Sequence, residues 1–306
     1  MSIAELEAET LLTEKPEGYF TIIWRRFRRH KLALAGVALI ILFALAAVFA
    51  PLIAPYDPLK PDMSTRNATF SSEHLMGTDQ IGRDVFSRLL YAGRISLTIS
   101  FTVVIMIETS GALIGAVSGY YGGWVDTLIQ RVTEFMLTLP VLPLLLVLSA
   151  ILRGVRIPWL PAEWSSTVIV IIVLSVLGWM TPCRLVRAMV LSLREREFTE
   201  ASRALGMSDL RIILRHMLPN ALPPLIVDAT LNLGGMIIYE SALSFLGLGV
   251  QIPVATWGNM LNEYQQDMWT QPLKVFSPGV AIFLTTLSFN YVGDGLRDAL
   301  DPRLKL

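Results

Sequence analysis

Long uninterrupted runs of apolar residues dominate this sequence, and its polar residues gather between the runs. Residues 32–54 read LALAGVALIILFALAAVFAPLIA and contain no charged side chain. A bilayer core about 30 Å thick needs about 20 such residues in a helix. A core helix of a soluble protein would show a polar face within that length. The run therefore predicts a first transmembrane helix over residues 32–54.

Five further apolar segments are long enough to cross a membrane. They cover residues 96–121, 128–152, 167–191, 221–246 and 273–291. Together the six segments predict an all-α membrane protein in which both termini lie on the same side. The predicted divisions are an N-terminal tail (1–31), the first transmembrane helix (32–54), a loop on the opposite side (55–95), a five-helix core (96–293) that contains a loop at 193–220, and a C-terminal tail (294–306).

The composition agrees with a membrane protein and argues against other classes. Hydrophobic residues make up 53% of the 306 positions and charged residues only 16%, against about 25% charged in soluble domains. The 25 basic and 25 acidic residues balance, so the net charge does not suggest nucleic acid as a partner. The single cysteine, Cys183, excludes an intrachain disulfide. The three histidines, His30, His74 and His216, lie too far apart in the sequence to predict a metal site.

The basic residues predict which side of the membrane each loop faces. Five of them, and no acid, lie directly before the first apolar run in WRRFRRHK, residues 24–31. The segment 184–216 has seven arginines against four acids. Positive charge in short loops marks the cytoplasmic side. We therefore expect an inner membrane protein with both termini and the 193–220 loop in the cytoplasm. The long first run also predicts an uncleaved anchor rather than a signal peptide.

One polar stretch with helical spacing interrupts the apolar sequence. Residues 198–220 read FTEASRALGMSDLRIILRHMLPN. Gly206 is expected to end a first helix with a positive φ. Ser208 is suited to cap a second helix, with Asp209 at its positive end, and Pro219 is expected to end that helix. The residues alone predict two short helices at an angle, and an ordinary solvated loop is an equal alternative.

The same stretch resembles a known element of ATP-binding-cassette importers. Glu200-Ala201-Ser202, then Gly206, then a distal Leu-Pro is similar to the EAA loop of importer permeases. Ser202 replaces the usual second alanine, and His216 stands where isoleucine is frequent. In that family the loop docks into a groove on a cytosolic ATPase subunit. The resemblance implies that this contact is made by Glu197, Glu200, Ala201, Ser202, Ala204, Leu205, Gly206, Ser208, Asp209 and Arg211.

Three longer segments extend the resemblance over nearly the whole chain. Residues 75–97 (LMGTDQIGRDVFSRLLYAGRISL), 240–261 (ESALSFLGLGVQIPVATWGNML) and 289–304 (FNYVGDGLRDALDPRL) are similar to segments of the C-type permeases of dipeptide, oligopeptide and nickel importers. The resemblance implies a type I importer permease with the MetI-like fold. It also implies a heterodimer with a B-type permease, two cytosolic subunits that hold ATP and Mg²⁺, an extracytoplasmic binding protein, and contact with membrane lipid. Peptides are the expected cargo, with nickel chelates or glycosides as alternatives.

The sequence predicts a transport subunit that has no ATPase site of its own and is not an enzyme. It contains no G-x-x-x-x-G-K-[ST] phosphate-binding loop. No histidine falls within a predicted span and there is no H-E-x-x-H motif, so no catalytic residue is predicted and an intramembrane enzyme is not supported. A secondary transporter driven by an ion gradient would explain the carboxylate of Glu108 but not the EAA-like loop.

Two features lie inside the second predicted span. A carboxylate within the membrane is costly to insert, and Glu108 is expected either to contact cargo in the lumen or to pair within the protein. Gly111, Gly115 and Gly119 recur every four residues. Small residues at this spacing let membrane helices approach closely, either within this chain or across a dimer.

Other charged residues are predicted to be structural. Glu134 is expected to pair with Arg131, and Glu240 to make hydrogen bonds near a membrane face. An interfacial ion-pair cluster is expected after the last span, formed by Asp294, Arg297 and Asp298.

The 55–95 loop is predicted to contain a compact turn followed by an amphipathic helix. The turn residues are Gly77, Asp79, Gly82, Arg83 and Asp84, and the apolar residues of the helix are Val85, Phe86, Leu89 and Leu90. Two roles are equally open for this loop: docking of the external binding protein, or a lid that rests on the bundle.

Overall fold

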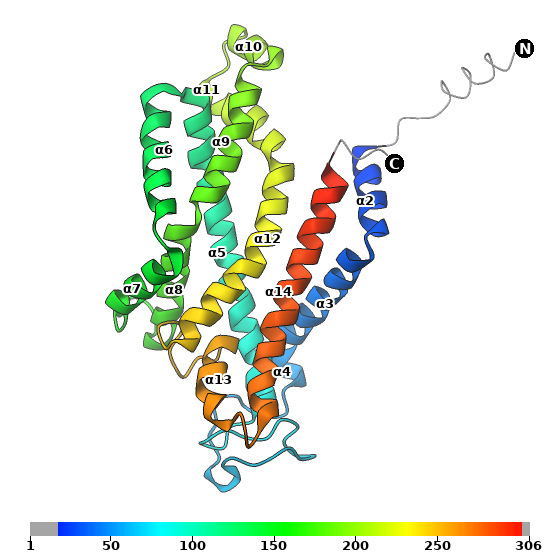
Figure 1. Ribbon diagram of the computed structural model, residues 1–306, viewed down its shortest axis with the longest axis vertical. Helices are drawn as coiled ribbons and strands as arrows, with labels where there is room; N and C mark the ends of the chain where they lie inside the picture. Colours follow the sequence, from blue (N-terminus) through cyan, green and yellow to red (C-terminus); the bar gives the residue numbers. More distant parts are fainter. Residues whose placement is uncertain (1–17, 302–306) are drawn as a thin grey trace, which may run out of the picture.

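The computed structural model describes residues 18–301 as a bundle of helices (Figure 1). These residues form no β-strand, and one isolated bridge joins Thr78 to Asp84. The α-helices are α2 (Tyr19–Arg29), α3 (Lys31–Val48), α4 (Ala50–Ile53), α5 (Val85–Tyr121), α6 (Gly123–Thr138), α7 (Val141–Leu152), α8 (Ala162–Gly178), α9 (Met180–Arg194), α10 (Glu197–Ala204), α11 (Asp209–Ile212), α12 (Leu218–Phe245), α13 (Trp257–Tyr264) and α14 (Pro272–Leu300). Short 3-10 turns are η1 (Met63–Thr65) and η3 (Gln265–Asp267), and η2 (Ile213–Met217) is a π-helical turn. The outer parts of the two predicted tails, residues 1–17 and 302–306, lie outside the described residues.

Five stretches of helix are long and apolar enough to cross a membrane within the described part of the chain. They are Lys31–Val48, Val85–Tyr121, Glu163–Arg194, Asp209–Phe245 and Pro272–Leu300. A sixth crossing is reached if the bent pair α6 and α7 is counted as one span. The predicted all-α membrane architecture is confirmed.

The predicted third span, 128–152, is not one straight helix. It falls on α6 and α7, which meet at an angle of 91°. Leu139 between them has φ −79° and ψ 136°, an extended conformation. Pro140 follows it, and proline disfavours helical backbone in the residue before it. The run of apolar residues gave the length of this segment correctly and its shape wrongly, because hydropathy carries no direction.

Two other predicted boundaries are also wrong. The amphipathic helix and the second span are one helix, α5, which is 37 residues long. The last helix, α14, continues to Leu300, so Asp294, Arg297 and Asp298 lie on it rather than after it. Of this predicted cluster, Asp298 lies 4.0 Å from Nε2 of His30.

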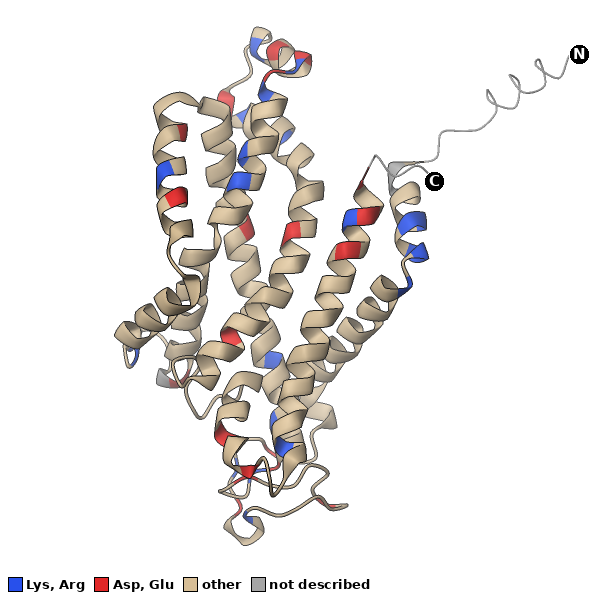
Figure 2. Ribbon diagram, viewed as in Figure 1, with Lys and Arg blue, Asp and Glu red and all other residues tan. Residues whose placement is uncertain are grey.

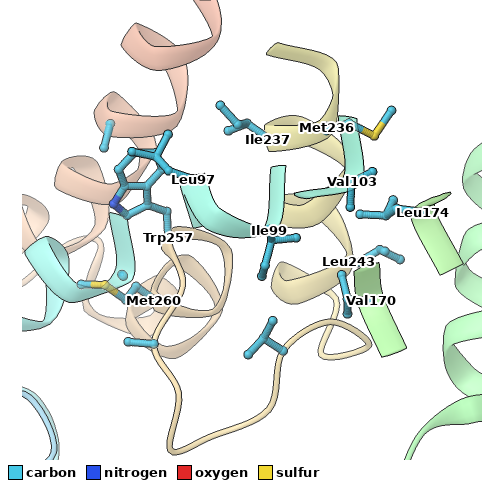
Figure 3. Packing of buried hydrophobic residues seen from close by; sticks show 14 of the residues in the cluster. Leu97, Ile99, Val103, Val170, Leu174, Met236, Ile237, Leu243, Trp257 and Met260 are labelled. Atoms are coloured by element: carbon cyan, nitrogen blue, oxygen red, sulfur yellow. The ribbon is translucent and has the colours of Figure 1, made fainter. Parts of the chain in front are cut away.

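The central helix of the bundle is α5, which packs against α9, α12, α8 and α3. Figure 3 shows the core near the end where α13 lies, with side chains from four helices in contact. The labelled residues are Leu97, Ile99 and Val103 of α5, Val170 and Leu174 of α8, Met236, Ile237 and Leu243 of α12, and Trp257 and Met260 of α13. This packing fixes α5 against the rest of the chain.

The two ends of the bundle differ in what they carry. The start of α2 and the end of α14 lie toward the same end as α10 (Figure 1). The 55–84 segment and α13 lie at the opposite end. Charged residues gather toward both ends and are sparse on the helices between them (Figure 2), as a membrane core requires.

Candidate functional site

The EAA-like loop forms a short helix that projects from one end of the bundle (Figure 1). This helix, α10, is separated from the end of α9 by two residues. The buried hydroxyl of Thr199 donates a hydrogen bond to the carbonyl of Leu193, 2.8 Å away. Ser202, also buried, donates to the carbonyl of Phe198 at 2.7 Å. The Leu193 carbonyl also accepts from the N–H of Arg196 at 3.2 Å, so both of its bonds hold the start of α10 against the end of α9.

Gly206 ends α10 as predicted. Its φ is +77°, in the left-handed region that favours glycine. Its N–H donates to the carbonyl of Arg203 at 2.9 Å, and the N–H of Met207 donates to Ser202 at 3.1 Å, the pattern of a glycine cap. A Cβ added at Gly206 would meet no atom within 4 Å. Backbone conformation alone, and not crowding, calls for glycine here.

The predicted end of the second short helix is wrong. α11, η2 and α12 follow one another without a break, so the helix that begins at Asp209 continues into the fifth span. Pro219 lies in the first turn of α12 rather than after a helix. The π turn just before it widens the helix, and the N–H of Leu218 bonds to the carbonyl of Ile213. A π turn accommodates a local change in the hydrogen-bond ladder, so the proline is tolerated where a regular helix would break.

Tyr120 near the end of α5 holds both sides of this loop. Its hydroxyl donates to Oδ1 of Asp209 at 2.7 Å and accepts from Nε of Arg203 at 3.3 Å. The guanidinium of Arg203 also lies over the Tyr120 ring, 5.0 Å from its centroid. Ser208 occupies the N-cap position but its side chain makes no capping bond. No sequence motif pointed to Tyr120, because it lies 83 residues from Arg203.

The residues predicted to make the partner contact are almost all accessible. Of the ten, only Ser202 is buried. The exposed ones are Glu197, Glu200, Ala201, Ala204, Leu205, Gly206, Ser208, Asp209 and Arg211. Among them Leu205 is 86% exposed, and Leu210 beside them is 65% exposed. The loop thus presents apolar side chains among charges, a composition typical of interaction sites.

Comparison with known proteins assigns the family. Residues 111–306 match the model described as "binding-protein-dependent transport system inner membrane component", and residues 18–69 match the N-terminal transmembrane domain of oligopeptide transport permease C. The chain is 41% identical to the dipeptide transport system permease protein DppC of Alkalihalophilus pseudofirmus, over 95% of this chain and 94% of that protein. The chain belongs to this family. It is therefore a multi-pass inner membrane permease component of the ATP-binding-cassette importer class.

Two further comparisons support this assignment. The permease is 41% identical to the nickel transport system permease protein NikC of Escherichia coli, over 90% of this chain and 94% of that protein. Among solved structures, it matches a chain of the MetNI methionine ABC transporter with a TM-score of 0.50 and 19% identity, over 71% of this chain and 98% of that one. At that identity the match shows the fold, and the expected MetI-like fold is confirmed.

The three glycines of α5 in this permease lie against α9. A Cβ at Gly111 would lie 2.7 Å from the carbonyl oxygen of Trp179, and one at Gly119 would lie 2.8 Å from that of Arg187. A Cβ at Gly115 would collide with the carbonyl of Cys183. Such contacts bring the two helix backbones together within this chain, as expected for small residues in membrane helices.

Glu108 lies inside the chain and pairs with α12. It is 6% exposed, and its Oε1 accepts a hydrogen bond from Nδ2 of Asn232 at 2.8 Å. The same nitrogen donates to Oδ2 of Asp228 at 3.1 Å. Asp228, with Arg297, lines a cleft of about 550 Å³ between α9, α12 and α14. Sequence reasoning missed Asp228, although a second carboxylate within the fifth predicted span was a readable signal.

Two other predicted pairings can be compared with the geometry. Glu134 lies 3.4 Å from Nη1 of Arg131, and both side chains are exposed. Glu240 is fully buried and makes the expected structural hydrogen bonds: it accepts from Ser96 at 3.1 Å and Ser244 at 2.8 Å. Ser96 in turn accepts from the N–H of Trp257 at 3.2 Å. Glu240 therefore links α5, α12 and the start of α13.

The opposite end of the permease carries a buried network of ion pairs. Arg83 bonds to Asp79 at 2.6 Å and also to Glu263 of α13. Arg88, whose side chain is 1% exposed, lies 2.6 Å from the same Glu263. Burial also raises the pKa of Tyr264 beside this network, so its hydroxyl stays neutral. The network fastens the predicted turn to α5 and α13.

Sequence reasoning found the turn residues of this network and missed two of its charges. Asp84 was predicted in the turn, and its Oδ1 lies 3.0 Å from Nδ1 of His74. Arg88 and Glu263 were not singled out, because they lie 175 residues apart in the sequence. Only the fold brings them together.

Proposed function

We propose that this permease moves peptides into the cell, driven by ATP hydrolysis on separate subunits that grip the α10 loop. The observation that carries the proposal is the projecting helix α10 with its glycine cap and exposed Leu205. Leu205 and Leu210 are 86% and 65% exposed on this projecting loop, and a partner surface would remove both side chains from water. The family match supplies the class of partner.

The proposed assembly contains a related B-type permease as the second wall of the pathway. Two cytosolic subunits, each holding ATP and Mg²⁺, would contact one permease each. An extracytoplasmic binding protein would deliver cargo to the opposite end, where Trp269 is 91% exposed and Ile252 74% exposed. The ion pairs that hold the 55–84 segment to α5 and α13 are compatible with both predicted roles, a docking platform and a lid that rests on the bundle.

The proposed orientation places α10 and both termini in the cytoplasm. The arginine-rich 24–31 segment and the α10 loop support it through the positive-inside rule. A Leu205→Cys variant tests it, because the chain's own cysteine, Cys183, is 0% exposed. A membrane-impermeant maleimide should label this variant in inside-out vesicles from cells that lack the ATP-binding subunits, and not in intact cells. Labelling of intact cells would overturn the orientation.

Peptide cargo is proposed from the transport systems to which two relatives belong. One relative is a dipeptide permease and another is a glutathione permease, GsiD, at 41% identity each. The nickel permease NikC has the same identity, so nickel chelates are the second candidate. Uptake of a labelled dipeptide and, separately, of a labelled nickel chelate by proteoliposomes holding the full complex separates the two. Uptake of the nickel chelate alone would refute peptide cargo.

The coupling role is tested by placing valine at two glycines with the same backbone strain. Gly206 and Gly247 have φ of +77° and +74°, and a Cβ at either would meet nothing within 4 Å. A β-branched residue in this region costs about 1–2 kcal/mol. Gly206→Val should leave ATP hydrolysis largely intact and reduce uptake per ATP, while Gly247→Val, at the other end, should not change this ratio. Full coupling in Gly206→Val would contradict the assignment.

A further inference from the structure

The hydroxyl of Tyr120 lies where the end of α5 meets α10 and α11. The proposed coupling role of α10 does not explain this contact. Tyr120 is the last residue but one of α5, and it is only 4% exposed. It lies at the same end of the bundle as α10. A tyrosine buried to this degree normally places its hydroxyl against a partner.

This hydroxyl has two partners, one on each side of Gly206. Arg203 comes from α10, before the glycine, and donates to the hydroxyl from 3.3 Å. Asp209 is the first residue of α11, after the glycine, and accepts from the hydroxyl at 2.7 Å. Tyr120 therefore joins both arms of the bent loop through a single oxygen atom.

Two further contacts fasten the same residue. The backbone carbonyl of Tyr120 accepts a hydrogen bond from Nη1 of Arg194, the last residue of α9, at 3.3 Å. The Arg203 guanidinium lies over the tyrosine ring at 5.0 Å, where a cation is attracted to the face of the ring. One residue of α5 thus contacts the end of α9, the body of α10 and the start of α11.

Through α5, Tyr120 is connected to the opposite end of the bundle. α5 is one unbroken helix from Val85 to Tyr121, about 55 Å long at the usual rise per residue. Near its other end Arg88 binds Glu263 of α13. A displacement of Tyr120 along the helix axis would therefore also move the opposite end of α5, because the helix contains no break.

The chain connects α10 covalently to α9 and, through Gly206, to α11, and not to α5. Without the tyrosine contacts, motion of α10 could reach α5 only indirectly, through the packing of α5 against α9 and α12. The three close glycines hold α5 against α9 side by side, but they do not hold it to α10.

We propose that Tyr120 is a positioning residue that transmits the displacement of α10 to α5, so that the central helix moves together with the coupling helix. The proposal rests on the proposed function, since it needs α10 to be the element that the ATP-binding subunits move. It adds a specific link, hydroxyl to Arg203 and Asp209, that the EAA-like motif does not contain.

The test compares Tyr120→Phe with Tyr121→Phe in the complete importer reconstituted in proteoliposomes. Tyr120→Phe keeps the ring and removes both hydroxyl bonds. Tyr121 is the matched control, because it is the next residue, is 53% exposed and packs edge to face on Tyr120 through a ring that phenylalanine preserves. ATP hydrolysis, cargo uptake, thermal stability and copurification of the ATP-binding subunits are measured for each variant.

Tyr120→Phe should hydrolyse ATP at the wild-type rate within about twofold and take up about fivefold less cargo per ATP, the factor expected for one or two lost hydrogen bonds. Tyr121→Phe should match the wild type. A merely structural role would lower both activities in parallel with stability or subunit copurification, and this outcome would overturn the proposal. An unchanged ratio of uptake to hydrolysis in Tyr120→Phe would overturn it equally.

Asp209→Asn supplies a second, independent variant. It weakens the same junction from the other arm, so its coupling defect should not add to that of Tyr120→Phe in the double variant, as expected for residues in one interaction. Additive defects would place the two residues in separate roles and count against the link. Absence of ATP-dependent uptake by the wild-type importer would refute the proposed function. Normal uptake per ATP in Tyr120→Phe, with an active wild type, would refute only the role of Tyr120.

Discussion

Replacing Gly111 by alanine should force α5 and α9 apart at one of their close approaches. A Cβ at this position would lie 2.7 Å from the carbonyl oxygen of Trp179, 2.9 Å from Cβ of Pro182 and 3.0 Å from the backbone nitrogen of Cys183. Backbone atoms and a proline ring cannot rotate away, so the added methyl group is relieved only by movement of a helix.

The size of the effect follows from two opposing terms. Ordinary contacts between such atoms lie at about 3.5–4.0 Å, so α9 must move by roughly 1 Å. Overpacking of this kind costs about 1–3 kcal/mol. Alanine returns up to about 1 kcal/mol because it is a better helix former than glycine. The net loss should be about 1–2 kcal/mol, or a fall in Tm of roughly 2–3 °C for a chain of this length.

Gly235 on α12 provides the matched control, because a Cβ there would meet no atom within 4 Å. Gly235→Ala carries the same gain in helix propensity without the collision, so its Tm should stay level or rise. Both variants are purified in one detergent and melted side by side, with size-exclusion recovery as the signal. A Gly111→Ala protein as stable as Gly235→Ala would refute the close-approach reasoning.

Two other substitutions test the buried polar groups. Glu263→Ala should lower the free energy of unfolding by about 3 kcal/mol, because it leaves the buried guanidinium of Arg88 without its nearest carboxylate. Limited proteolysis should then cut the 55–84 segment faster than in the wild type. Unchanged cleavage would show that other contacts hold the segment. Glu240→Leu should lower the free energy of unfolding by about 2–4 kcal/mol, because the buried hydroxyls of Ser96 and Ser244 each lose an acceptor. A melting temperature equal to that of the wild type would show that these hydrogen bonds do not stabilise the fold.

Much of the fold could be predicted from the sequence, for a physical reason. An apolar run of membrane length has few stable places other than the bilayer, so length and polarity fixed where the spans lie. The positive φ of Gly206 was equally readable, since a glycine between two helical patterns has few other uses. Local signals of this kind depend only on neighbours in the chain.

Only the tertiary structure shows the angles between these helices and which of their residues contact one another. The break at Leu139 follows from the proline after it, but hydropathy alone does not give the 91° angle between α6 and α7. The continuous helix through Pro219 and the burial of Glu240 depend on what packs alongside. The same holds for the junction at Tyr120, where the Arg203 partner lies 83 residues away. The sequence by itself determined how much of this chain is buried in lipid and where its polar loop falls. Only the fold decided which polar atoms meet, because hydrogen bonds and close helix contacts act over a few ångströms between residues that are distant in the chain.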